Sequence, residues 1–160
     1  MTHTFRSISG LASRRRARPA VERATFVVAA IGASRLAFPV EWVERVLRNT
    51  TDSADAPLAY GHRALTVCDV AASLGLTAAP VPSVTRRVLV LRDASLAADG
   101  CAVLVDSVHE VFAVEIAHIR PVTDGATADI ARHSAIRGVF ERDAHEVWVL
   151  DPSRLLREVA

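Results

Sequence analysis

The apolar and polar positions between Cys101 and Val122 form the most regular pattern in the chain. An apolar run ends at Asp106, and two sets of side chains then alternate along residues 108–115. A period of two is typical of strands, so the pattern predicts two paired strands joined by a tight turn at Asp106-Ser107. Neither run carries a nucleophile, a glycine-rich phosphate loop or a cluster of metal ligands, which favours a binding module.

Further short apolar runs, bounded by turn residues, predict more strands along the chain. A glycine turn at Gly32 separates the first two runs, and Asp143-Ala144 separates the last two, so each pair should form a hairpin. Many short strands with few helices favour a mostly β fold built from small barrels. The predicted strands cover residues 26–31, 35–39, 63–68, 88–91, 102–105, 108–114, 135–141 and 146–150.

Three segments instead have helical signals. Apolar positions after Pro39 recur at i, i+3, i+6 and i+7, which predicts a helix. Asp69 can cap a short helix that ends at Gly75, and Asp151 can cap a helix at the end of the chain. The apolar residues after Pro39 are Val40, Val43, Val46 and Leu47.

Composition is that of a globular protein, with 51% apolar residues. No apolar run approaches the roughly 18 residues that a membrane-spanning helix needs, so we expect no membrane insertion. Cys68 and Cys101 lie inside apolar, strand-like segments, which predicts two buried, reduced thiols rather than a disulfide. With no secretory signal in the sequence, the expected compartment is the cytoplasm.

Charge is distributed unevenly along the chain. Residues 1–23 contain six arginines and one glutamate, whereas the remainder carries thirteen arginines and seventeen acidic residues. We expect a flexible arginine-rich tail over residues 1–23 and one folded domain of two subdomains over residues 24–160. An arginine cluster can attract nucleic acid, so a small nucleic-acid-binding barrel is an alternative. The acidic body and the 5% aromatic content, which gives few platforms for stacking bases, argue against it.

Candidate catalytic and metal-binding groups lack the spacing that such sites need. The histidines do not pair with each other or with cysteines at the two-to-four-residue spacing of zinc sites, so we expect surface histidines, no metal and no cofactor. Asp106 and Glu110 could be paired carboxylates, but Asp106 stands where a turn needs an acceptor. We therefore expect a turn former and a solvated acid, with an interface role as one option for the pair. No small-molecule substrate and no enzymatic activity are predicted. The histidines considered are His62, His109, His118 and His133.

Four segments carry motifs in a specific order and spacing. They read F-V-V-A-A-I-G-A-S-R-L-A-F-P-V-E-W-V-E-R-V-L-R, Y-G-H-R-A-L-T-V-C-D-V-A-A-S-L-G, L-V-D-S-V-H-E-V followed by I-R-P-V, and I-R-G-V-F followed by V-W-V-L-D-P-S-R-L-L. Together, over about residues 25–158, they resemble the CheW-like adaptor domain of bacterial chemosensory systems.

The resemblance implies two five-stranded β-barrels packed side by side, a few short helices, no catalysis and no cofactor. It also implies a signalling scaffold that couples the cytoplasmic tip of chemoreceptors to the regulatory domain of a CheA-type histidine kinase. Matching the motifs residue by residue carries over a set of partner-binding positions. They are Val43, Val46, Gly61, His62, Asp106, Glu110, Ile136, Arg137 and Gly138.

The chain departs from the family pattern near Gly61-His62, where the family usually has arginine followed by glycine. The segment between Leu47 and Tyr60 is also shorter than usual, and Thr66 stands where proline is common. These positions belong to or adjoin the receptor-facing surface of the family. A diverged module that binds the kinase without typical receptors is therefore a second alternative.

Overall fold

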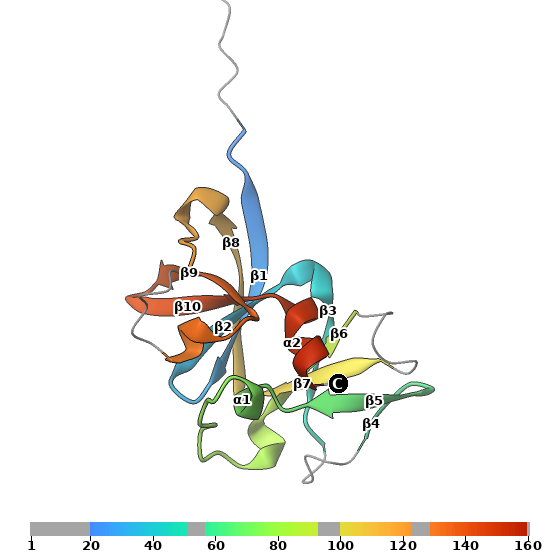
Figure 1. Ribbon diagram of the computed structural model, residues 1–160. Helices are drawn as coiled ribbons and strands as arrows, with labels where there is room; N and C mark the ends of the chain where they lie inside the picture. Colours follow the sequence, from blue (N-terminus) through green and yellow to red (C-terminus); the bar gives the residue numbers. More distant parts are fainter. Residues whose placement is uncertain (1–19, 51–56, 93–99, 123–128, 160) are drawn as a thin grey trace, which may run out of the picture.

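Two five-stranded sheets, here called sheet A and sheet B, form the body of the protein (Figure 1). The computed structural model describes residues 20–50, 57–92, 100–122 and 129–159. Sheet A contains, in spatial order, β8 (Ser107–Glu115), β1 (Arg23–Ile31), β2 (Ser34–Pro39), β10 (His145–Leu150) and β9 (Ile136–Arg142). Sheet B contains β3 (Val43–Arg48), β6 (Arg87–Leu91), β7 (Cys101–Val105), β5 (Arg63–Cys68) and β4 (Leu58–Tyr60). The predicted mostly β fold with two five-stranded units is confirmed, and sheet B has the form of a half-barrel.

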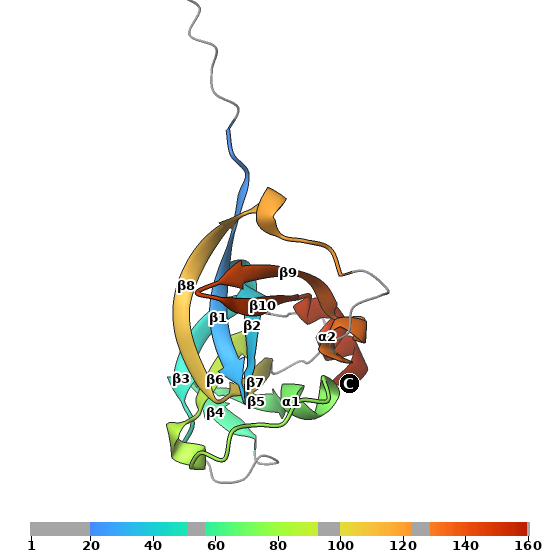
Figure 2. The same ribbon diagram turned by 90° about the vertical axis from the view of Figure 1, so that its left-hand side faces the viewer.

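The helices are short and peripheral. Figure 2 shows α1 and α2 near each other on one side of the sheets, in agreement with the contact between them. No helix within the described residues is long and apolar enough to cross a membrane. The helical elements are α1 (Val70–Ser73), α2 (Pro152–Val159) and four 3-10 turns, η1 (Val40–Trp42), η2 (Ser83–Thr85), η3 (Ile116–His118) and η4 (Asp129–Arg132).

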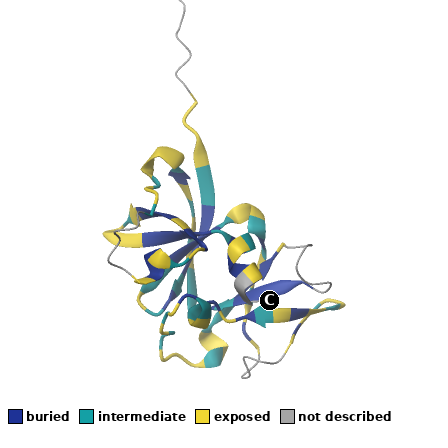
Figure 3. Ribbon diagram, viewed as in Figure 1, coloured by how far each residue is buried: buried dark blue, intermediate teal, exposed yellow. Residues whose placement is uncertain are grey.

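The buried side chains form three groups, of which one joins the two sheets. One lies within sheet A, one within sheet B, and the largest is shared between both sheets, α1 and α2. Strand β1 contributes side chains to two of these groups. Phe26 and Val28 belong to the sheet A group, whereas Val27, Ala29 and Ile31 belong to the shared one. Because both faces of β1 are buried (Figure 3), its sequence is a nearly continuous apolar run rather than an alternating one.

Both predicted hairpins are confirmed. Strands β1 and β2 pair antiparallel around Gly32, and β9 and β10 pair antiparallel around Asp143-Ala144. Asp143 and Ala144 have φ values of 51° and 60°. A two-residue turn with positive φ at both central positions has the twist that suits two paired strands.

The predicted pairing across Asp106-Ser107 is wrong. Strands β7 and β8 cover the predicted ranges and extend one residue beyond them, but β7 pairs with β5 and β6 in sheet B, whereas β8 pairs with β1 in sheet A. The chain therefore crosses from one sheet to the other at Asp106. Strand β7 is buried on both faces, which suits an interior strand of sheet B.

The helix predicted after Pro39 is also wrong. Only a single 3-10 turn, η1, follows the proline, and β3 then pairs antiparallel with β6. Val43 and Val46 are β-branched, and such side chains lose little freedom in a strand. Pairing with an apolar neighbouring strand thus prevailed over a helical spacing that was only a few residues long.

The two other helices are confirmed. The carboxylate of Asp69 accepts a hydrogen bond from the backbone N–H of Ala72 and caps α1, and Gly75 follows that helix with a φ of 65°. Asp151 accepts from the N–H of Ser153 at the start of α2.

The expected tail falls mostly on residues 1–19, outside the described part of the chain. Arg23, which we had placed in the tail, is the first residue of β1. It pairs with Glu115 of β8, both in the strand register and through an ion pair of 3.3 Å. The sheet thus begins one residue before position 24, where we expected the folded domain to start.

Candidate functional site

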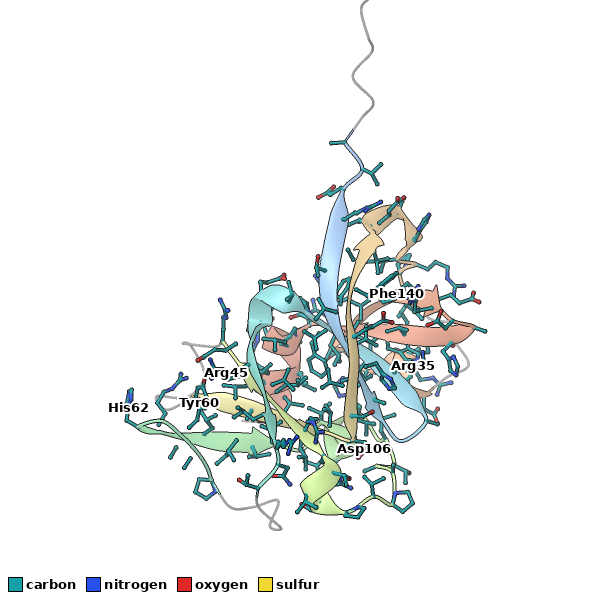
Figure 4. All side chains as sticks on the ribbon, turned by 180° about the vertical axis from the view of Figure 1, so that it is seen from behind. Arg35, Arg45, Tyr60, His62, Asp106 and Phe140 are labelled. Atoms are coloured by element: carbon teal, nitrogen blue, oxygen red, sulfur yellow. The ribbon has the colours of Figure 1, made fainter. Side chains whose placement is uncertain are left out.

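The nine predicted partner-binding residues do not gather at one point. They lie on β3, on the β4–β5 turn, at the crossing between the sheets, on β8 and on β9. Figure 4 shows this spread, with His62 at one end of the molecule and Asp106 toward the middle. Each group therefore has to be assessed in its own surroundings.

Strand β3 separates the two predicted valines. Val43 is buried in the shared core, whereas Val46 is 41% exposed and neighbours the exposed Arg45. Of the two valines, only Val46 has an exposed side chain, and β3 is an outer strand of sheet B. An apolar side chain with an arginine beside it is the kind of composition that protein interfaces favour.

Gly61 and His62 form the two-residue turn between β4 and β5. Tyr60 pairs with Arg63 across it, and Gly61 has a φ of 61°, which glycine adopts without a steric penalty. His62 is exposed at the tip. The order Gly-His, which departs from the family pattern, thus makes a well-formed turn.

At the open side of each sheet, an arginine lies over an aromatic ring and pairs with a glutamate of another strand. The sequence analysis missed this feature. In sheet B, Arg63 lies over the ring of Tyr60 at 5.0 Å and pairs with Glu44 of β3 at 2.9 Å. Arg63 lies on β5 and contacts Tyr60 of β4 as well as Glu44 of β3. Because β3 and β4 are the two outer strands, the arginine links opposite edges of the sheet. Charge pairing of Arg-Glu type cannot be assigned from sequence when the partners are nineteen residues apart.

Sheet A has the corresponding contact at its own open side. Arg142 of β9 donates through Nε and Nη2 to the two carboxylate oxygens of Glu110, at 3.2 and 3.3 Å, and lies 4.1 Å over the ring of Phe112. The hydrogen bond with Glu110 raises the pKa of Arg142. Glu110, predicted as a contact residue, is therefore already engaged in joining β8 to β9.

Asp106 is a hub between the sheets and not a solvated turn acid. Its side chain is only 8% exposed, and Oδ2 accepts hydrogen bonds from the N–H of Gly32 at 2.6 Å and of Ala79 at 2.7 Å. Nε of Arg86 lies 3.3 Å from Oδ1 as an ion pair, without the alignment of a hydrogen bond. The carboxylate holds together the β1–β2 turn, the loop after α1 and the crossing from β7 to β8.

The residues of β9 also have structural surroundings. Ile136 is buried, and a Cβ on Gly138 would lie 2.8 Å from the carbonyl oxygen of Arg120. That close approach lets Arg120 exchange two backbone hydrogen bonds of 2.9 Å with Val139, which closes sheet A beyond β8. Arg137 is exposed and pairs with Asp151 at 3.7 Å.

Asp151 illustrates how the acids of this chain are used. Burial disfavours its charged form, but hydrogen bonds from Ser153 and the backbone of Arg154, with the charge of Arg137, outweigh that effect and lower the pKa of Asp151. The carboxylate caps α2, so its ionised state supports the helix. Its role is structural.

A hollow of about 440 Å³ lies at the open side of sheet A. Its floor includes Phe112 and Phe140, and charged groups stand around it. Two of the lining side chains, Arg23 and His118, lie 3.3 and 3.9 Å from the carboxylate of Glu115, which also lines the hollow. Within the described residues, no three His, Cys, Asp or Glu side chains gather as metal ligands.

The family model for the CheW-like domain matches residues 25–160. The chain belongs to the CheW-like domain family. Proteins of this family are non-enzymatic scaffolds, and membership supports a role as a chemotaxis scaffold adaptor in general terms.

A structural relative agrees with the fold. The crystal structure of the scaffolding protein TtCheW from Thermoanaerobacter tengcongensis superposes with a TM-score of 0.66 at 16% sequence identity, over 81% of this chain and 85% of that one. At that identity the likeness concerns the fold alone. None of the curated proteins matches the sequence.

Proposed function

We propose that this protein is a cytoplasmic, non-enzymatic scaffold that couples chemoreceptors to the regulatory domain of a CheA-type histidine kinase in a chemosensory pathway. The observation that carries the proposal is the family match over residues 25–160, together with two sheets that share one core. The absence of a cluster of three potential metal ligands among the described residues is compatible with a scaffold that works through its surfaces.

The proposed mechanism is positioning by rigid surfaces. Arg63 and Arg142 hold the open sides of the sheets, and Asp106 holds the sheets to each other. A scaffold built this way presents its outer strands at fixed relative positions, which lowers the entropic cost of binding two partners. On sheet B the exposed Val46 and the tip residue His62 are the proposed contacts.

Titration calorimetry with the isolated regulatory domain of the kinase tests the proposal. We expect saturable binding, and we expect Val46→Asp to weaken it at least about tenfold, because a charge would be desolvated in an apolar contact. Val21→Asp is the matched control, since Val21 is also an exposed valine but lies before β1 at the far end of sheet A. Absence of binding at high micromolar concentration, with circular dichroism showing folded protein, would contradict the coupling role.

The diverged module is the second candidate, and the Gly61-His62 turn favours it. A scaffold of this kind would bind the kinase domain while failing to retain a receptor tip in a pull-down. His62→Gly should then raise receptor retention, because it removes the exposed imidazole at the position where the family usually has glycine. Retention of the receptor by the unaltered protein would instead support full coupling.

A further inference from the structure

Two cysteines of the second sheet lie in direct contact inside the shared core. Cys68 ends β5 and Cys101 begins β7, and these strands are parallel neighbours. Their Sγ atoms are 2.7 Å apart, and both residues are about 5% exposed. A disulfide bond is about 2.05 Å long, so the sulfurs need to move only about 0.7 Å toward each other to join.

The pairing of β5 with β7 explains why this position matters. The two strands are aligned through only three residue pairs, from Thr66 with Cys101 to Cys68 with Val103. Strand β4 pairs in turn with β5 alone. Within the described residues, strand pairing therefore joins the β4–β5 hairpin to the rest of sheet B through this short parallel ladder, and the two thiols lie on it.

We propose that Cys68 and Cys101 are a redox-convertible pair that a hydroperoxide oxidises to an intramolecular disulfide, crosslinking β5 to β7. This inference does not depend on the proposed scaffold role. It assigns a modification site to a pair of residues that the family resemblance leaves without a function. The reduced pair is the state in the structure.

The chemistry balances with one equivalent of hydrogen peroxide. One thiolate attacks a peroxide oxygen and the O–O bond breaks, which gives a sulfenic acid and a hydroxide, and the hydroxide takes up the proton that the thiol released to form water. The second thiolate attacks the sulfenic sulfur and expels hydroxide, which takes a proton to form a second water. Two thiols are oxidised to one disulfide, and one peroxide is reduced to two waters.

The contact between the two sulfurs also favours ionisation of a thiol. The hydrogen bond with Cys101 lowers the pKa of Cys68, although burial acts in the opposite direction. A thiolate is the form that attacks a peroxide, so the contact between the two sulfurs favours the first step. Both residues stand at strand ends, where local opening of the sheet admits a molecule as small as hydrogen peroxide.

Closing the disulfide should stabilise the protein. The two residues are 33 positions apart, so the crosslink removes the freedom of a long loop from the unfolded chain. For a protein of this size we expect the melting temperature to rise by about 10 °C on oxidation. Reduction with dithiothreitol should reverse the rise.

The experiment uses the full chain, treated with hydrogen peroxide or kept in dithiothreitol. Titration of thiols after denaturation should show two thiols in the reduced protein and none after oxidation, and peptide mapping should find Cys68 linked to Cys101. Calorimetry of the same two samples measures the change in melting temperature. Because both states come from one unaltered protein, the comparison needs no variant to fold.

Cys68→Ala and Cys101→Ala are the matched controls. If they fold, each should retain a lone thiol that oxidises without raising the melting temperature. Any of four results would overturn the proposal. They are two thiols that survive peroxide, a disulfide between two molecules, over-oxidation of separate thiols, and an oxidised form with no higher melting temperature than the reduced one.

Discussion

Replacing Asp106 perturbs a side chain that contacts three separate segments at the junction of the sheets. Asp106→Ala removes the acceptor of two backbone hydrogen bonds, from Gly32 and Ala79, and the partner of the Arg86 guanidinium. Asp106→Asn keeps the shape of the side chain and one carbonyl oxygen. Comparing the two variants separates the hydrogen bonds from the charge.

The magnitudes follow from the contacts. Both backbone groups donate to the same oxygen, Oδ2, so the single amide oxygen of the Asp106→Asn variant could accept both, and only the ion pair with Arg86 would be lost. We expect Asp106→Asn to lower the free energy of unfolding by about 1–2 kcal/mol. Asp106→Ala should lower it by about 3 kcal/mol or more, because it also leaves two partly buried N–H groups without an acceptor.

Urea denaturation followed by tryptophan fluorescence measures both values. Trp148 is buried in the shared core and reports on its opening. The slope against urea should stay unchanged, so that the shift of the midpoint reflects stability alone. A loss below about 1 kcal/mol for Asp106→Ala, or equal losses for both variants, would refute the assignment of Asp106 as a hydrogen-bonding hub.

Two further predictions concern a glycine and a helix cap. Gly32→Ala should lower the free energy of unfolding by about 3 kcal/mol or more, because the φ of Gly32 is 57° and a Cβ would lie 2.0 Å from the carbonyl oxygen of Thr77. Gly61→Ala, with a φ of 61° but no atom within 4 Å of a Cβ, should cost only about 1 kcal/mol, and equal losses in thermal melts would disprove this account. The lowered pKa of Asp151 means that its carboxylate stabilises the fold above about pH 4, and that this contribution is lost as the pH falls through the lowered value. The Asp151→Asn variant should therefore be less stable than the unaltered protein at neutral pH and should lose less stability on acidification. Midpoints of urea denaturation measured between about pH 7 and pH 2.5 test this. Parallel plots of midpoint against pH for the two proteins would contradict the role of Asp151 as a helix cap.

Several elements could be predicted because their signals are local. The turn at Asp143-Ala144 and the helix caps at Asp69 and Asp151 depend on residues within a few positions of one another. Strand positions could be read in the same way, since a strand needs only a short apolar or alternating run. Where a local signal was weak, as in the short helical spacing around Val43, it was overruled by pairing with β6.

The candidate site could be predicted only as a set of residues, without their surroundings. Val46 and His62 are exposed as contact residues should be, and their partner-binding role stays a prediction. Glu110 was identified from its motif, but its engagement with Arg142 was not foreseen, because the two are 32 residues apart. No spacing rule links such positions.

Patterns along the chain were sufficient to predict the β-rich class, most strand and turn positions, and the resemblance to the CheW-like domain. Three features could be seen only in the folded protein. Strands β7 and β8 enter different sheets, the carboxylate of Asp106 is a buried hub, and Cys68 contacts Cys101. The reason is physical. Strand and turn formation depends on neighbouring side chains and backbone sterics, whereas the choice of partner depends on burying surfaces contributed by distant parts of the chain.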